Sequence, residues 1–364
     1  MKILIVQPAF WIYGGAEKVI VKLANYLIEH NHEVTILTTQ MIPEVKKDLT
    51  DTRLLECKDF QEMTNILHAI SQDFDVINVH NEPCHLMNFP QKNNVVWNCN
   101  EPPNQFADGG HIPFAEIEMV RDSIKKFVVA DEFNKKRLME IYTPAILDND
   151  LDIEINPYGV DYEFWSEKPT MHEVEEMHYK IRQDPKNFYI TQTAFIAPTK
   201  NQIKTVQIFA EVKKKIPNAK LVLAGYDRLP YRQEVENEAF KLGVHDDIII
   251  TGVLTQEEVR ALYSFTNILL MPVKSQGSWL TVFEAMSAGV PVVTSKEFTA
   301  SDILYQKNIG AVCDSMEEYV ETITHPWGDS IHSEEAKDFV RNELTWELFC
   351  ERMVKIYGEV MAHV

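Results

Sequence analysis

The segment best suited to bind an anion covers residues 271–293, with the sequence MPVKSQGSWLTVFEAMSAGVPVV. Its apolar and polar pattern predicts a strand, a turn at 275–280, a helix and a second strand. Backbone N–H groups of such a turn and of a helix amino terminus suit a diphosphate. Glu284 would lie one turn into the helix, where a carboxylate can accept two hydrogen bonds from a ribose diol. Thr281 and Glu284 also have the spacing of a capping box, in which the glutamate serves only its own helix.

Lysine and glycine positions after other predicted strands are further candidates. Lys200, in APTKNQ, could neutralise a phosphate as a point charge, although an isolated lysine is usually a solvated surface residue. Gly225 follows LVLA and could serve a ligand or only a tight turn. Gly14 and Gly15 could let a sugar or phosphate approach the backbone next to a helix, or serve turn geometry alone. The sequence has no GxGxxG at this turn, so a standard dinucleotide site is not supported.

A group of possible metal ligands follows the strand at 76–79. It consists of His80, Glu82, Cys84 and His85. Their spacing fits no standard zinc pattern, and they follow a strand rather than lying on one helix face. We therefore expect no metal site. No Ser-His-Asp or Cys-His arrangement can be assigned from the sequence.

These candidates need a scaffold of parallel strands and helices. The apolar run 3–6, a helical pattern through Val19, Leu23 and Leu27, and a second run at 34–37 predict a βαβ unit with a parallel sheet. Further strands are predicted at 76–79, 95–97, 127–130, 188–196, 221–224, 248–250, 268–271 and 292–294. Helices are predicted at 201–215, 232–242, 256–264 and 281–288. Ligands of such sheets bind beyond the carboxyl ends of the strands, where the candidate residues fall.

The length and order of these elements predict two domains of the α/β class. The 364 residues favour two domains over one. We place a first Rossmann-like domain at 1–165 and a second Rossmann-like domain at 166–345. The charged stretch 161–186 is expected to be a linker with a short helix. The segment 346–364 is expected to form an amphipathic helix. Two such domains facing each other would form a cleft.

Composition excludes several classes of protein. The formal net charge of −20 argues against a broad nucleic-acid footprint, and the 45% apolar and 25% charged fractions are ordinary for a globular protein. Five cysteines without CxxC spacing favour reduced thiols and a cytoplasmic location. No apolar run reaches the length of a membrane span. The start MKILIVQPAF is broken by Gln7 and Pro8, so it favours a buried strand over a signal peptide.

Taken together, GGAEKV, NPYGVD, KNQ, LVLAG and VFEAMSAGVPVV resemble the retaining glycosyltransferases of family four, in the same order and with similar spacing. The resemblance covers nearly the whole chain and is strongest over 188–294. It implies the GT-B fold of two Rossmann-like parallel-sheet domains, a UDP- or GDP-linked sugar donor, retention at the anomeric carbon and no required metal. It also implies no permanently bound cofactor. The carboxy-terminal domain of the family holds the donor, and the amino-terminal domain holds the acceptor, so the resemblance implies nucleotide-sugar binding by 166–345 and an acceptor side at 1–165. The final helix of the family usually crosses back to the first domain, as we expect for 346–364.

The resemblance assigns roles to individual positions of the donor domain. Glu284 matches the second glutamate of the family's Glu-x7-Glu motif, which binds the ribose. Lys200 matches the lysine that contacts the phosphates. The amides of Gly277, Leu280 and Thr281 match the cradle of the β-phosphate.

Glycines of both domains match family loops. Gly14 and Gly15 match the loop near the phosphates and acceptor. Gly225, in LVLAG, is expected on the donor side.

Three positions depart from the family pattern. The first motif glutamate is Gln276, an arginine near the phosphates is replaced by Phe195, and the histidine beside the donor sugar is replaced by Asn100. Asn100, Gln276 and Lys200 are the expected catalytic positions. The two amides suggest a donor other than a UDP-glucose-like hexose, such as a pentose, a 6-deoxy sugar or an N-acetylated sugar. Neutral substitution within a tolerant family is the alternative.

The expected activity is therefore hexosyl or pentosyl transfer from a nucleoside-diphosphate sugar to a glycan, lipid-linked or small-molecule acceptor, with peripheral membrane contact as a further possibility. A catalytically silent GT-B partner, or a protein that only binds sugar nucleotides, is the main rival because of the three departures. A sugar-nucleotide epimerase or a phosphorylase is disfavoured by the match over 271–293. The base, the sugar, the acceptor and the oligomeric state do not follow from the sequence.

Overall fold

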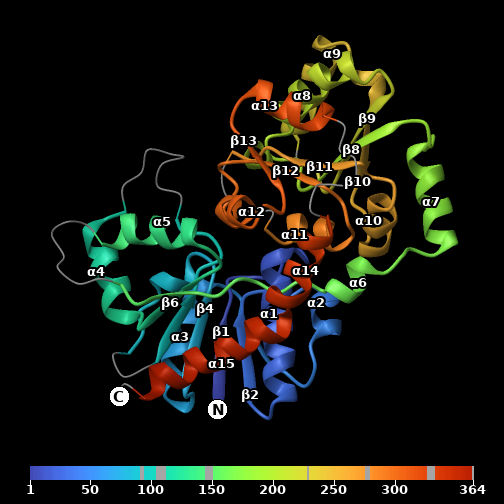
Figure 1. The fold of residues 1–364 in the computed structure, drawn as a ribbon. Helices are drawn as coiled ribbons and strands as arrows, with labels where there is room; N and C mark the ends of the chain where they lie inside the picture. The colour runs from blue at the N-terminus through green and yellow to red at the C-terminus, as the bar shows by residue number, and fades with distance from the viewer. Residues whose placement is uncertain are drawn as a thin grey trace. The chain divides into compact units, whose positions relative to one another are not determined.

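The computed structural model describes residues 1–90, 94–103, 112–143, 151–227, 229–274, 279–325 and 333–362. The chain divides into two compact units, each built on a parallel sheet (Figure 1). Unit 1 comprises Met1–Gly159 and Trp346–Val364, and unit 2 comprises Val160–Thr345. The α/β class expected from the sequence, with two Rossmann-like units, is confirmed.

The sheet of unit 1 has the strand order β3-β2-β1-β4-β5-β6-β7, and its paired strands are parallel. Its strands are β1 (Lys2–Val6), β2 (Glu33–Thr38), β3 (Arg53–Glu56), β4 (Val76–His80), β5 (Val95–Asn98), β6 (Lys126–Val129) and β7 (Ile153–Ile155). Its helices are α1 (Gly15–Glu29), α2 (Pro43–Asp48), α3 (Phe60–Ile70), α4 (Phe114–Ser123), α5 (Glu132–Tyr142) and α15 (Trp346–Ala362), with short 3-10 turns η1 (Ser71–Asp73) and η2 (Cys84–Leu86).

The central strand of unit 1 is apolar on both faces because helices cover both. Leu4 and Val6 belong to the core cluster that includes Leu67 of α3 and Leu138 of α5. The last helix, α15, packs against α1 (Figure 1). The side chain of Asn156 fixes its amino-terminal part by donating a hydrogen bond of 3.0 Å to the backbone oxygen of Phe349.

The sheet of unit 2 has the strand order β10-β9-β8-β11-β12-β13, and its paired strands are also parallel. Its strands are β8 (Phe188–Thr193), β9 (Ala219–Ala224), β10 (Ile248–Gly252), β11 (Ile268–Met271), β12 (Val292–Ser295) and β13 (Ala311–Cys313). Its helices are α6 (Tyr162–Ser166), α7 (Met171–Ile181), α8 (Gln202–Lys215), α9 (Tyr231–Lys241), α10 (Gln256–Tyr263), α11 (Trp279–Ser287), α12 (Ser301–Lys307), α13 (Met316–Thr324) and α14 (Ser333–Glu343), with η3 (Pro198–Lys200) and η4 (His245–Asp247).

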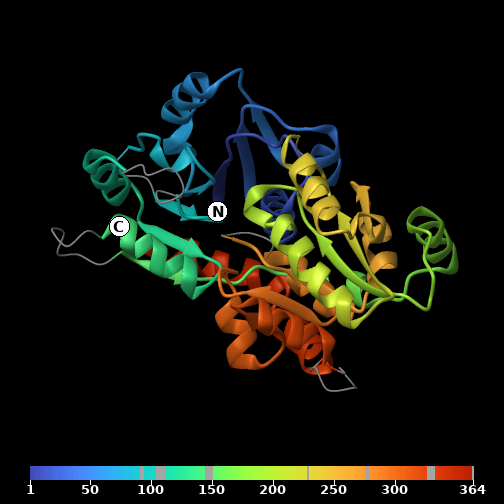
Figure 2. The same ribbon diagram turned by 90° about the horizontal axis from the view of Figure 1, so that it is seen from above.

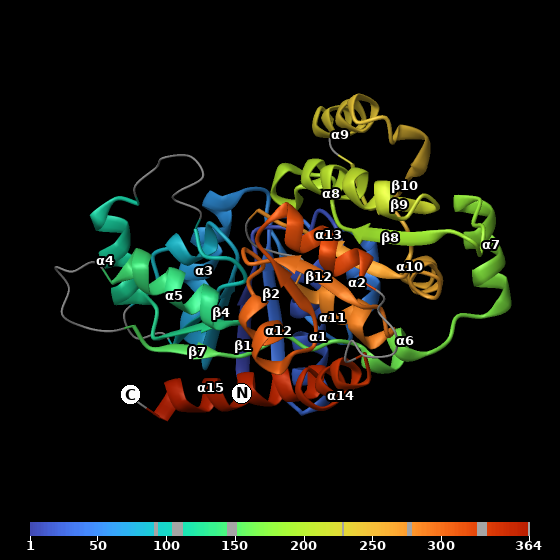
Figure 3. The same cartoon turned by 45° about the horizontal axis from the view of Figure 1, so that its top comes forward.

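Helices cover both faces of the second sheet. Along β9, Leu221 and Leu223 join the core cluster with residues of α8, α9 and α13, whereas Val222 joins the cluster with residues of α7 and α10. This alternation is the two-residue period of a strand. Helices α8 and α9 lie together on one face (Figure 2), and α7 packs against α10 (Figure 3).

Some sequence-predicted site residues of each unit follow a strand at a reversal of strand order: Gly14 and Gly15 follow β1, and Lys200 follows β8. Asn100 and Gly225 follow the neighbouring strands β5 and β9. The orders β3-β2-β1-β4-β5-β6 and β10-β9-β8-β11-β12-β13 are the doubly wound pattern, in which the crevice for ligands lies beyond the carboxyl ends of the two central strands. In unit 1 these strands are β1 and β4, and in unit 2 they are β8 and β11. The expected helices and strands are present to within a few residues, except that β8 ends at Thr193 rather than at 196.

Two regions differ from the sequence expectation. The stretch 161–186 contains two helices, α6 and α7, instead of one. Trp165 of α6 and Met177 of α7 are buried, and Arg260 of α10 binds Glu173 of α7, so this stretch is packed structure rather than a linker. The short strands β3, β7 and β13 were not expected, because none of them contains a continuous apolar run of four residues.

Candidate functional site

The turn that carries Lys200 is tied to the segment leading into α11. The backbone N–H of Lys274 donates to the oxygen of Thr199 at 3.0 Å, and the side-chain amide of Asn201 donates to the oxygen of Pro272 at 2.9 Å. Asn201 adopts the left-handed conformation, with a φ of 59°, which asparagine tolerates well. These bonds hold together the two loops that follow β8 and β11, at the reversal of strand order in unit 2.

Two buried glutamines fix the shape of the same turn. Gln202 donates to the oxygen of Phe195 at 2.8 Å and accepts from the N–H of Ala197 at 3.3 Å. Gln192 of β8 donates to the oxygen of Lys200 at 2.7 Å, and the hydroxyl of Thr205 donates to Gln192 at 2.6 Å. The backbone around Lys200 is therefore preorganised from both sides. Neither glutamine was predicted as a site residue, although the motif KNQ contains Gln202.

Helix α11 begins at Trp279, earlier than the sequence predicted. Leu280 and Thr281 consequently lie in its first turn, where backbone N–H groups have no partner within the helix. Thr281 is inside the helix, so it is not the N-cap residue, and the proposed capping box of Thr281 with Glu284 is wrong. Gln276 and Gly277, expected to contact the donor, lie outside the described residues.

Glu284 projects from the second turn of α11 and is half-buried. Burial raises the pKa of the Tyr263 phenol, and the nearby charge of Glu284 raises it further. Tyr263 is hydrogen-bonded to Thr193 at 2.7 Å, so Glu284 lies near the carboxyl end of β8. Glu284, the residue predicted to bind the ribose, therefore lies at the strand end that leads to Lys200.

Gly225 meets a steric requirement. A Cβ at this position would lie 2.1 Å from the backbone oxygen of Ala194, and the φ of Gly225 is 150°. Any side chain would therefore separate the ends of β8 and β9. On either side of this contact, the partly exposed rings of Phe195 and Tyr226 meet edge to face, with centroids 6.3 Å apart. Phe195 is thus paired with another ring at the position where the family pattern has arginine.

In unit 1, the turn that contains Gly14 and Gly15 is hydrogen-bonded to a carboxylate of α1, the helix that follows it. Gly14 precedes the first residue of α1, Gly15, and its N–H donates to Glu17 at 3.0 Å. Glu17 is buried, and its burial raises the pKa of the carboxyl. A negative charge at the amino end of a helix interacts favourably with the helix dipole. Because Glu17 accepts the hydrogen bond of Gly14, that N–H is not directed at a phosphate in this structure.

Asn100 belongs to a network of neutral side chains at the carboxyl ends of β1, β4 and β5. Its oxygen accepts hydrogen bonds from Asn98 at 3.1 Å and from the phenol of Tyr158 at 2.8 Å, and its N–H donates to Asn81 at 2.9 Å. Asn81 in turn donates to Gln7 at 2.9 Å. Burial raises the pKa of Tyr158 well above its usual value, so its hydroxyl retains its proton and donates.

The network limits how the side chain of Asn100 could bind a donor sugar. Its oxygen is already shared by two protein donors, so the side chain offers a ligand fewer free groups than the sequence suggested. The expectation named Asn100 but missed Gln7, Asn81 and Tyr158. The motif NPYGVD pointed to the segment with Tyr158, but nothing local indicated which strand end it would contact.

The candidate metal ligands after β4 are separated by the fold. His80 is buried and its Nε2 is hydrogen-bonded to Asn78 at 2.8 Å, whereas the ring of His85 stacks on Trp97 at 4.1 Å. Among the described residues, no group of three or more His, Cys, Asp or Glu side chains could hold a metal ion. The five cysteines are buried and unpaired.

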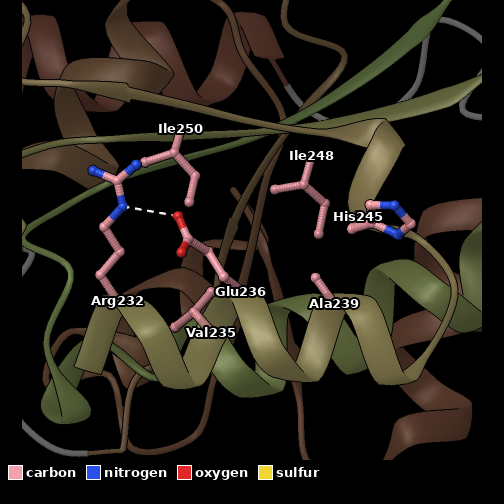
Figure 4. Close-up of a pocket in the computed structure, with 7 residues that line it drawn as sticks. All are labelled: Arg232, Val235, Glu236, Ala239, His245, Ile248 and Ile250. Atoms are coloured by element: carbon pink, nitrogen blue, oxygen red, sulfur yellow. Dashed lines mark hydrogen bonds and ion pairs between the residues drawn. The ribbon is translucent and has the colours of Figure 1, made fainter. Parts of the chain in front are cut away.

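A cavity of about 250 Å³ lies between α9 and β10, away from the predicted site residues (Figure 4). Val235 and Ala239 of α9 face Ile248 and Ile250 of β10 across it. At one end, Arg232 is hydrogen-bonded to Glu236 at 2.9 Å. We assign no function to this cavity. In the described part of the chain, no helix is long and apolar enough to cross a membrane.

Most of unit 2 matches a known protein family. Residues 173–343 match the family described as glycosyl transferases group 1, which confirms the expected resemblance over this part of the chain. A GDP-mannose-dependent alpha-(1-6)-phosphatidylinositol monomannoside mannosyltransferase of Mycolicibacterium smegmatis is 25% identical over 184 residues, 49% of this chain and 46% of that protein. An alpha-monoglucosyldiacylglycerol synthase of Streptococcus pneumoniae is 24% identical over 216 residues, 57% of this chain and 48% of that protein. The chain thus spans about half the length of the curated relatives it matches.

Solved structures share the complete fold at low sequence identity. A glycosyltransferase of Rickettsia africae superposes with a TM-score of 0.79 at 18% identity, covering 100% of this chain and 99% of that one. HepE of Anabaena, solved in complex with UDP and glucose, gives a TM-score of 0.79 at 13% identity, covering 99% and 100%. The fold of two Rossmann-like parallel-sheet domains is therefore GT-B, as expected.

Proposed function

We propose that this GT-B chain, whose residues 173–343 match the glycosyl transferases group 1 family, transfers a sugar from a nucleoside-diphosphate sugar to an acceptor with retention of configuration. One observation carries the proposal. The hydrogen bonds from Lys274 to Thr199 and from Asn201 to Pro272 hold the turn of Lys200 against the segment that leads into α11. The backbone that carries Lys200 is thereby held beside the segment that precedes a helix, at the ends of two neighbouring strands. A lysine and a helix amino terminus placed in this way suit a diphosphate.

In this proposal the donor is bound mainly by unit 2. Lys200 and the first-turn amides of Leu280 and Thr281 stabilise the diphosphate, and Glu284 accepts hydrogen bonds from the ribose diol. Gly277 extends the phosphate cradle and Gln276 contacts the donor sugar. These roles follow from the family resemblance together with the positions of the described residues in unit 2.

The family resemblance also assigns roles to residues of unit 1. In this proposal Gly14 and Gly15 contribute to binding of the acceptor or the sugar, and Asn100 contributes the part of its amide that the network leaves available. Gly225 keeps the ends of β8 and β9 close together behind the donor, so its role is positional.

The proposed reaction needs little from a protein base. The bond between the anomeric carbon and the diphosphate oxygen breaks, and the acceptor oxygen forms a bond to the same face of that carbon. The acceptor proton passes to the departing diphosphate. Lys200 and the amides of α11 stabilise the charge that develops on the diphosphate as it leaves. No metal is required for this step as proposed.

The names of the relatives support a proposal for the chemical class of the donor and of the acceptor. One relative is named as dependent on GDP-mannose, and HepE was solved with UDP, so we propose a UDP- or GDP-linked hexose. The names of two relatives contain phosphatidylinositol and diacylglycerol. We therefore propose a lipid-linked acceptor over a free glycan or small molecule.

A sugar-nucleotide-binding protein without transferase activity is the second candidate. It is favoured by the neutral residues Phe195 and Asn100, which replace charged or titratable groups of the family pattern, and by the full use of the Asn100 oxygen inside the protein. Under this proposal nucleotide binding persists without turnover.

A panel of UDP- and GDP-sugars separates the two candidates. Binding of each donor is measured by calorimetry, and release of free nucleoside diphosphate is measured with and without glycolipid acceptors. We expect one donor to bind best and to be consumed faster with acceptor, with the product showing the anomeric configuration of the donor by proton NMR. Binding without any turnover supports the second candidate, and absence of nucleotide binding contradicts both.

A further inference from the structure

The turn between β1 and α1 exposes three consecutive apolar side chains. Trp11 is 69% exposed, Ile12 is 41% exposed and Tyr13 is 39% exposed. The residue before them, Phe10, is fully buried, and its backbone pairs with a neighbouring loop through hydrogen bonds to Gln40 and Ile42 of 2.7 and 3.1 Å. The exposed segment 11–13, called the tip below, therefore follows a residue that is fixed by burial and by backbone hydrogen bonds.

This tip lies in an uncharged stretch of a strongly acidic protein. Residues 3–16, ILIVQPAFWIYGGA, contain no charged side chain, although the net charge of the whole chain is −20. Burial of a charged group in an apolar phase is costly, and the tip avoids that cost. The stretch also contains Gly14 and Gly15, so the tip is continuous with the proposed acceptor side of the site.

We propose that the tip Trp11-Ile12-Tyr13 enters the interfacial layer of a lipid bilayer that carries the acceptor. The acceptor part of this inference rests on the proposed function, whereas bilayer contact by the tip does not. Trp and Tyr combine an apolar ring with a polar group and concentrate at membrane–water interfaces. A bilayer-bound tip beside Gly14 and Gly15 would bring a lipid headgroup to the acceptor side of the site.

The size of the tip favours lipid over a protein partner. Two aromatic side chains and one isoleucine offer at most about 600 Å² of surface. A stable protein interface buries about 800 Å² on each partner. Since residues 3–16 carry no cation and the chain is acidic, attachment is apolar and does not depend on anionic lipid.

Sedimentation with phosphatidylcholine vesicles tests the proposal on the full chain. The triple variant Trp11→Ser, Ile12→Ser and Tyr13→Ser is compared with the wild type. The control is Tyr179→Ser with Tyr305→Ser, which removes two rings that are 90% and 80% exposed in unit 2. We expect the wild type and the control to bind vesicles equally, and the triple variant to lose about tenfold or more in partitioning. Anionic lipid in the vesicles should not strengthen binding.

Folding and nucleotide binding of each variant are measured in parallel. The thermal midpoint and the affinity for UDP and GDP should match the wild type, which shows that a lost vesicle interaction is not caused by unfolding. Wild-type protein that stays in the supernatant, or a triple variant that sediments equally, overturns the proposal. A triple variant that sediments equally but uses a water-soluble acceptor less well shows that the tip binds sugar rather than lipid. Vesicle binding by the tip without any sugar transfer leaves this inference intact and contradicts only the proposed function.

Discussion

The phenol of Tyr158 donates a hydrogen bond of 2.8 Å to Oδ1 of Asn100, which also accepts one from Asn98. Asparagine at position 100 is therefore explained by partners inside unit 1, without a change of donor sugar. This weakens the hypothesis that a pentose, deoxy or acetamido donor accounts for the residue. It also makes Tyr158 a positioning residue for the strand end after β5.

Removing this hydrogen bond should lower the free energy of unfolding of unit 1. The effects of the two substitutions should not be additive, because each removes the same bond. We expect Tyr158→Phe to lower the free energy of unfolding by about 1 kcal/mol, because one buried hydrogen bond is lost. Asn100→Ala should cost about 2–3 kcal/mol, since it leaves the groups of Tyr158, Asn98 and Asn81 without their partner. Urea unfolding of both single variants and the double variant gives a coupling energy of about 1 kcal/mol. Additive effects would show that the bond does not form in solution.

Lys200 is expected to bind phosphate rather than the nucleoside. Lys200→Ala should weaken binding of the nucleoside diphosphate by about 10- to 100-fold, the range of a hydrogen bond to a charged group. Binding of the free nucleoside should change by less than about twofold. Calorimetric titration with both ligands measures the difference. Lys215→Ala, at the carboxyl end of α8, is the matched control, and an equal loss for both ligands would contradict the assignment.

Glu284 is expected to recognise the ribose diol. Glu284→Gln keeps the size of the side chain but removes the charge, and should weaken nucleoside-diphosphate binding by about tenfold or more. The loss should shrink to about twofold for a 2′,3′-dideoxy analogue, because that ligand lacks the hydroxyl groups that the carboxylate accepts from. Equal losses for the two ligands would mean that the carboxylate of Glu284 interacts with α11 or Tyr263 and not with the ribose hydroxyl groups.

Gly225 is expected to be required for packing. Gly225→Ala places a Cβ 2.1 Å from the oxygen of Ala194, so the ends of β8 and β9 must separate. We expect a loss of more than about 3 kcal/mol in the free energy of unfolding of unit 2. Gly243→Ala is the control, because Gly243 also has a positive φ of 70° but has no atom near the added Cβ. That variant should lose only about 1–2 kcal/mol. Similar losses would show that conformation alone, not contact with Ala194, explains Gly225.

The main elements could be predicted because their apolar patterns are local. Strands such as β1 and β11 are continuous apolar runs, and the pattern in α1 repeats every four residues. The edge strands β3, β7 and β13 have three or four residues, of which only Cys313 is buried, so no local pattern identifies them. The stretch 161–186 was misinterpreted because its charges, such as Glu173, pair with the distant Arg260.

The candidate site could be predicted in its position but not in its contacts. Lys200 and Glu284 follow strands that end at the crevice, which the order of elements implies. The partners that shape the site are far away in the sequence, as in the bonds from Asn201 to Pro272 and from Tyr158 to Asn100, 71 and 58 residues apart. Only the folded sheet brings them together, so the amide network of unit 1 was missed.

Two buried histidines should make unit 1 less stable in mild acid. Burial lowers the pKa of His80 to about 3 and that of His85 to about 4. His80 binds Asn78 through Nε2, His85 is hydrogen-bonded to Tyr142, and the Nδ1 atoms of both histidines have no hydrogen-bond partner in the described structure. A proton added at either Nδ1 would be a buried charge without an acceptor. Both rings are therefore neutral in the folded protein at pH values where the unfolded chain binds protons.

The sign of the effect follows from this difference. Because the folded pKa is below the unfolded value of 6.5, the stabilisation is complete above pH 6.5 and is lost as the pH falls towards the folded pKa values. Each histidine should lower the free energy of unfolding by on the order of 2 kcal/mol between pH 7 and pH 5. Urea unfolding of unit 1 at both pH values measures the change. His85→Gln should reduce the dependence on pH, whereas His172→Gln, at an exposed position of α7, should leave it unchanged. If His85→Gln and His172→Gln have the same dependence as the wild type, protonation of the buried histidines does not control the acid stability of unit 1.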